Sequence, residues 1–100
     1  MLQLTRSAAD QVAEVRRAQG LPDTVGLRIF GETRTGGEMA VGLAFAEVPA
    51  EDDEVIVEQE TVVFVAPEVA GPLASAALDV QQTAEGAKLV LKQQEPGEQA

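Results

Sequence analysis

The 100-residue chain contains no cysteine, histidine, tryptophan or tyrosine. Without thiols it can form no disulfide, no thiolate-ligated zinc or iron–sulfur site and no cysteine nucleophile. Without histidine it lacks the side chain that most often serves as a general base near neutral pH. A cysteine-free chain is compatible with any redox compartment. These absences nevertheless exclude most catalytic and metal-binding arrangements, so the sequence predicts a protein that is not an enzyme.

Positive charge is also scarce, because seven Lys and Arg residues face 17 Asp and Glu residues, for a net charge of −10. The basic residues are scattered along the chain. Binding to nucleic acid requires clustered basic side chains, and anionic lipid surfaces attract the same kind of cluster. We therefore expect neither nucleic acid nor membrane as a partner, whereas basic protein surfaces stay possible.

Aromatic residues amount to 3%, namely Phe30, Phe45 and Phe64. The core must then consist mostly of Val, Leu and Ala, and a domain of this size with such a core has a stability of about 3–5 kcal/mol. A homodimer would bury more apolar surface, and a marginally stable monomer is the alternative.

No apolar run approaches the ~18 residues of a membrane span. The first residues, MLQLTRSAAD, lack the basic and apolar regions of a signal peptide. A cytoplasmic location is the resulting expectation.

Apolar periodicity and turn residues predict one mainly β domain over residues 1–92, followed by a polar, flexible tail over 93–100. A helix is expected over 6–19, and a short second helix is expected to begin at Pro67. The expected strands cover residues 1–5, 25–30, 39–45, 55–57, 61–66, 76–81 and 87–91. This order favours a small β-sandwich or partial barrel with the N-terminal helix packed on it.

The first helix has a clear beginning and end in the sequence. Thr5 or Ser7 is expected to cap it, and Ser7 with Asp10 resembles a capping box. Gly20 suits the left-handed position after the last turn. Arg16 is expected to face water.

The stretch from Gly26 to Phe45 predicts a central hairpin with a polar loop over Gly31–Gly37. Gly42, inside the returning strand, indicates a bulge or a close backbone approach. The loop glycines do not form a phosphate-binding GxGxxG motif.

Two segments could bind a ligand. The acidic run Glu51–Glu54 could hold a hard cation through oxygen, although a solvated loop is the favoured interpretation. With the Thr33–Gly37 loop it forms a possible small-ligand or divalent-metal site. Ser7 and Ser75 have no base nearby in sequence, so no catalytic residue, metal ligand or cofactor is assigned.

Several short motifs follow one another along the chain in a characteristic order and spacing. They are LQLTRSAAD at the start, GLP at 20–22, GLRI at 26–29, GLAF at 42–45, DDEV at 52–55, VVFVAP at 62–67, LD at 78–79 and Gly86. In order and spacing the chain resembles the HesB-like, or A-type, iron–sulfur cluster assembly family over about residues 2–91. The resemblance implies a HesB-like small β-sandwich or pseudo-barrel.

The same resemblance identifies what is missing. Typical family members carry a cysteine in the central hairpin loop, and counting between GLRI and GLAF places that position on Gly36. They also end in a Cys-Gly-Cys segment, where this chain has the polar tail. Because soft thiolates are the ligands of iron–sulfur clusters, the family's cluster chemistry does not transfer. The interpretation is a non-catalytic accessory or interaction module, with a second copy or a cluster-assembly protein as its partner.

Overall fold

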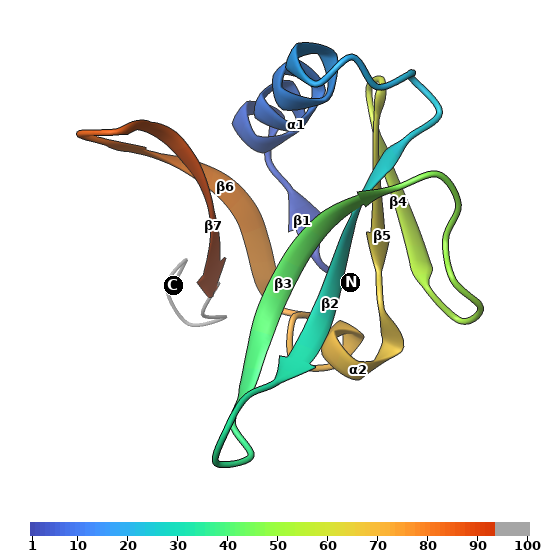
Figure 1. Cartoon of the computed structure of the whole chain (residues 1–100), viewed down its shortest axis with the longest axis vertical. Helices are drawn as coiled ribbons and strands as arrows, with labels where there is room; N and C mark the ends of the chain where they lie inside the picture. Colours follow the sequence, from blue (N-terminus) through green and yellow to red (C-terminus); the bar gives the residue numbers. More distant parts are fainter. Residues whose placement is uncertain (94–100) are drawn as a thin grey trace, which may run out of the picture.

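The computed structural model describes residues 1–93, apart from the side chains of Met39 and Gln93. It contains a three-stranded sheet in the order β1-β6-β7 and a four-stranded sheet in the order β3-β2-β5-β4. The helix α1 lies over one end of the two sheets, and the short α2 lies near the opposite end (Figure 1). The elements are β1 Gln3–Leu4, α1 Arg6–Ala18, β2 Gly26–Thr33, β3 Met39–Ala46, β4 Glu54–Glu58, β5 Thr61–Val65, α2 Pro67–Ala70, β6 Ala76–Thr83 and β7 Gly86–Gln93.

The expected fold class and element order are confirmed, including the short second helix with Pro67 at its first position. The strands are longer than expected at several ends. The last strand includes Gln93, and the rest of the expected tail lies outside the described residues. No helix of the described part is long and apolar enough to cross a membrane.

The core lies between the sheets and beneath α1. Strand β2 pairs with β3 in antiparallel fashion and with β5 in parallel fashion. Its inward side chains Leu27 and Ile29 are buried beside Val63 and Val65. As expected, β5 is mostly buried, because four of its five residues are. The buried cluster comprises Leu2, Ala8, Val12, Leu27, Ile29, Val63, Val65, Ala66, Val69, Leu73, Ala76 and Leu78.

Thr5 caps the N-terminus of α1 and links the helix to the three-stranded sheet. Its hydroxyl oxygen accepts a hydrogen bond from the Ala8 amide at 3.1 Å, which satisfies one of the free N–H groups of the first turn. The same hydroxyl donates to Asp79 of β6 at 2.9 Å, and the Thr5 amide donates to the Leu78 carbonyl. The expected capping box at Ser7 and Asp10 is therefore wrong, because the helix begins one residue before Ser7.

Arg16 is buried with 1% of its surface exposed, so the expectation that it faces water is also wrong. It lies one turn after Val12 on the same face of α1, which makes the packed face wider than the apolar stripe. Its guanidinium reaches the β4–β5 turn, where Nη1 donates to the Glu60 carbonyl at 3.4 Å. Nη2 lies 3.5 Å from Asp23. The aliphatic stem of Arg16 therefore serves as core surface while its head contacts backbone.

The central hairpin has a shorter loop than expected, because β2 runs to Thr33 and β3 begins at Met39. The pairing is continuous through Gly42, so the expected bulge is absent. Gly42 lies opposite Phe30, whose ring would be 2.6 Å from an added Cβ. The close approach at Gly42 is therefore made by the Phe30 side chain and involves no second backbone. Gly26 is covered in the same way by Phe64, at 2.8 Å from an added Cβ.

We predict that Gly26→Ala lowers the free energy of unfolding by about 1–2 kcal/mol, the usual cost of overpacking less the gain from a stiffer unfolded chain. The added methyl would meet the buried Phe64 ring and, at 3.0 Å, the Val62 carbonyl oxygen. Urea unfolding followed by circular dichroism measures the change. Gly71→Ala is the matched control, because an added Cβ there meets nothing within 4 Å. Equal stability of both variants would contradict the close packing at Gly26.

Candidate functional site

Gly36 lies at the tip of the β2–β3 hairpin, in the exposed segment 32–38. The turn is closed by the Arg34 amide, which donates to the Glu38 carbonyl at 2.7 Å, and by the Gly37 amide, which donates to the Arg34 carbonyl at 3.0 Å. Gly36 and Gly37 have φ of +92° and +83°, values that favour glycine strongly. A side chain at Gly36 would meet nothing within 4 Å. The position has room for a ligand, but the backbone of this turn suits glycine.

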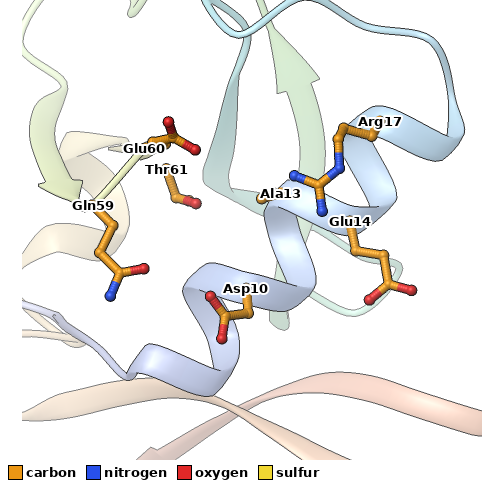
Figure 2. A pocket seen from close by; sticks show the side chains of 7 residues that line it. All are labelled: Asp10, Ala13, Glu14, Arg17, Gln59, Glu60 and Thr61. Atoms are coloured by element: carbon orange, nitrogen blue, oxygen red, sulfur yellow. The ribbon is translucent and has the colours of Figure 1, made fainter.

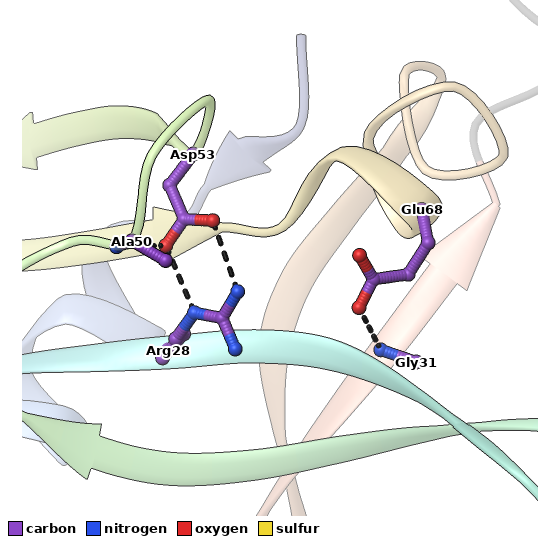
Figure 3. A network of polar contacts seen from close by, with 5 residues as sticks. All are labelled: Arg28, Gly31, Ala50, Asp53 and Glu68. Atoms are coloured by element: carbon purple, nitrogen blue, oxygen red, sulfur yellow. Dashed lines mark hydrogen bonds and ion pairs between the residues drawn. The ribbon is translucent and has the colours of Figure 1, made fainter.

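The acidic run Glu51–Glu54 does not converge on one point. Glu51 and Asp52 are exposed, whereas the Asp53 side chain is fully buried against β2. There its two oxygens accept hydrogen bonds from Arg28, at 2.8 Å from Nε and 3.0 Å from Nη2 (Figure 3). Among the described residues, no group of three or more acidic side chains is arranged to hold a metal ion.

The Arg28–Asp53 pair keeps both groups charged. Hydrogen bonds from the Arg28 guanidinium lower the pKa of Asp53, against the opposing effect of its burial, and the Ala50 amide adds a further hydrogen bond at 2.9 Å. The same bonds to Asp53 raise the pKa of Arg28. This bidentate geometry is the strong form of an arginine–carboxylate pair. It fixes the loop before β4 onto the outer face of the four-stranded sheet.

Glu68 makes a second long-range polar contact, 37 residues from its partner in sequence. Its Oε2 accepts a hydrogen bond from the Gly31 amide at 3.0 Å (Figure 3), which lowers the pKa of Glu68. The contact joins α2 to β2. Sequence reasoning missed it and the Arg28–Asp53 pair; the one available signal was an arginine placed inside an apolar strand.

The structure does not bring the two sequence-predicted binding segments together. Asp53 is held at Arg28, and Thr33, where the hairpin loop departs, lies five positions after Arg28 along β2. In an extended strand this is roughly 17 Å. Figure 1 shows the hairpin tip and the 47–53 loop projecting from different sides of the four-stranded sheet. A shared ligand site of Thr33–Gly37 and Glu51–Glu54 therefore has no support in the geometry.

Two hollows open on the surface near α1. A polar hollow of about 370 Å³ lies between α1 and the β4–β5 turn, and Figure 2 shows acidic residues on both elements, Asp10 and Glu14 on the helix and Glu60 on the turn. It is lined by Asp10, Ala13, Glu14, Arg17, Gln59, Glu60 and Thr61. An apolar hollow of about 340 Å³ is lined by Val12, Val15, Gln19, Leu27, Leu43, Ala44, Phe45 and Leu89. Neither lining contains Ser7, Ser75 or a lysine, so neither offers a serine with a base beside it.

The fold of this cysteine-free chain matches that of several solved structures. Among solved structures, IscA with the [2Fe-2S] cluster matches with a TM-score of 0.78 and 20% identity over 93% of this chain and 85% of that one. SufA of Escherichia coli matches at 0.74 and 16% identity over 99% and 90%. A protein from Aquifex aeolicus, solved by NMR, matches at 0.70 and 17% identity over 93% and 91%. The resemblance stated from the sequence is thus confirmed in the fold.

The chain matches no protein-family model and no curated protein. At identities of 16–20% the structural likeness establishes the fold, and function has to be argued from the residues present.

We predict that Asp53→Asn destabilises the protein at pH 7 by about 1–3 kcal/mol, because it weakens a charged hydrogen-bonded pair. Since the pKa of Asp53 is lowered on folding, the wild type has this contribution in full above the unfolded value near 3.9. It loses the contribution as the pH falls below about 4 and through the folded pKa. The stability difference between wild type and variant should therefore shrink with acidification, as measured by urea unfolding at pH 7, 5, 4 and 3.

Asp52→Asn is the control for this titration, because Asp52 is an exposed aspartate of the same loop. Its positive φ of 71° is one that asparagine tolerates. A pH-independent gap for Asp53→Asn, or an equal effect of Asp52→Asn, would contradict the assignment.

Proposed function

We propose that the chain is a cysteine-free HesB-like protein of iron–sulfur cluster assembly that serves as a non-catalytic accessory or interaction module in the cytoplasm. The observation that carries the proposal is an A-type fold in a chain that contains no cysteine, and by the sequence resemblance the cysteine of the hairpin loop is expected at Gly36. A loop without a thiolate, in a chain without cysteine or histidine, has no soft ligand for iron. The protein then contributes a surface to the assembly of clusters held elsewhere.

The partner we propose is a cluster-assembly protein or a second copy of the chain. The neighbouring IscA structure contains a [2Fe-2S] cluster, so a protein of the same fold is a reasonable candidate. Apolar surface supports association: Val41 and Leu43 of β3 are each 42% exposed, and Leu43 lines the apolar hollow.

Anaerobic reconstitution with ferrous iron and sulfide tests the first part. After desalting, we expect no visible absorption band and less than about one tenth of an iron per chain, because hard carboxylates bind clusters poorly. IscA treated in parallel is the positive control. A stable brown protein with bound iron and sulfide would contradict the proposal.

Sedimentation velocity tests the interaction. Cluster-loaded IscA is followed at a visible wavelength, where only the cluster absorbs, with and without an excess of this chain. A faster coloured boundary indicates a complex, and an unrelated acidic protein of equal mass serves as the control. The chain alone, followed in the far ultraviolet, reports its own dimerisation. An unchanged boundary together with a monomeric chain would contradict both proposed partners.

A further inference from the structure

Strand β4 is a free edge of the four-stranded sheet. Its sequence over Glu54–Glu58 is EVIVE, and it pairs with β5 on one side only, within the described residues. Figure 1 shows it as the outermost strand on that side of the sheet. The pairing with β5 is continuous from Glu54 to Glu58, without a bulge. A regular free edge presents a row of unpaired backbone N–H and C=O groups to any extended chain.

The outer face of this edge is apolar and uncovered. Val55 and Val57, two residues apart and hence on one face, are 48% and 63% exposed. Val48, in the loop before the strand, is 70% exposed. Branched apolar side chains in this position pack well against a neighbouring strand.

The other face of the same edge carries Glu54 and Glu58 on either side of Ile56, which packs against the core, and one glutamate oxygen there lacks a hydrogen-bond partner within the described part of the chain. Glu54 and Glu58 alternate with the valines and so lie on the opposite face from them. The Oε1 atom of Glu54 is buried and has no hydrogen-bond partner among the described residues. A buried oxygen without a donor is costly, and a cationic donor arriving along the edge would satisfy it.

Negative charge continues beyond the end of the strand. The β4–β5 turn leads into the polar hollow, where Asp10, Glu14 and Glu60 outnumber a single Arg17. A segment lying along β4 therefore meets carboxylates along one face of the strand and again at the turn.

We propose that the β4 edge binds an extended segment of a partner protein in which apolar and basic side chains alternate, as a fifth strand of the sheet. The backbone ladder would supply affinity, and the two faces would select the sequence. The apolar side chains would pack on Val55 and Val57, and the basic ones would reach Glu54 and Glu58. The proposal rests on the interaction role given above. The test of the β4 edge uses neither iron nor cluster-loaded IscA, so the failure of this proposal can be distinguished from the failure of the proposed function.

A second copy of the chain is the wrong occupant for this edge. The sequence EVIVE reads the same in both directions. Antiparallel self-pairing centred on Ile56 would place Glu54 opposite Glu58 twice, and parallel pairing in register would place each glutamate opposite itself. Like charges directly opposite each other are destabilising, and each chain carries a net charge of −10.

The probe is a fluorescein-labelled seven-residue peptide of alternating lysine and valine, followed by anisotropy and by ¹⁵N chemical shifts of the protein. We expect saturable binding with shifts centred on residues 54–58. Glu54→Gln with Glu58→Gln should weaken binding at least about fivefold, because it removes the charge-assisted bonds. Glu51→Gln with Asp52→Asn removes the same charge from the neighbouring exposed loop and should change binding less than about twofold.

Two N-methylated versions of the peptide separate strand addition from simple charge attraction. An edge strand uses alternate N–H groups, so methylation of one alternate set should abolish binding while methylation of the other should be tolerated. This comparison uses the wild-type protein and does not depend on the folding of any variant. Equal binding of both methylated peptides would overturn the proposal, as would no binding, equal effects of the two double variants, or shifts centred on another edge.

Discussion

The parallel pairing of β2 with β5 is the contact on which the rest of the structure depends. It places Leu27 beside Val63 and Ile29 beside Val65, and all four are at most 4% exposed. Parallel neighbours cannot be joined by a tight turn, so the connection between them has to leave the pair and return. This chain uses that connection for β3 and β4, which flank the pair as antiparallel strands. The hairpin tip, the acidic loop and the free β4 edge all follow from this arrangement.

The outer face of the same pair explains the polar structure of the protein. Arg28 lies beside Phe64 in the register, and its guanidinium carbon is 5.9 Å from the centre of the Phe30 ring. A guanidinium that lies over an aromatic ring on a sheet needs a counter-charge, and Asp53 supplies it from the loop that leads into β4. The ion pair holds the residue that directly precedes β4 against β2, so one carboxylate of the acidic run has a structural role.

The sequence was sufficient for features that are local. Helix α1, the left-handed Gly20 and the buried β5 follow from periodicity and from single-residue preferences. The missed features are long-range, because nothing in the sequence indicates that Arg28 and Asp53, which are 25 positions apart, come together in the fold. Arg16 was missed for a related reason: an arginine can face water or bury its stem, and only the position of the β4–β5 turn decides between them. The A-type resemblance was the exception, since it depended on the order of many weak motifs.

The hairpin tip can change its residues without disturbing the core. Residues 32–38 are exposed, and the turn is closed by its own backbone hydrogen bonds, so the residue at position 36 contributes nothing to the core. Core packing therefore places no constraint on the residue at this position. The exposed face of β4 is different, because it depends on the core. The register with β5 fixes which residues of β4 face inward, and the residues between them must then face outward. The fold therefore fixes the position and the exposed face of the β4 edge, although packing of the domain does not require that edge to stay free.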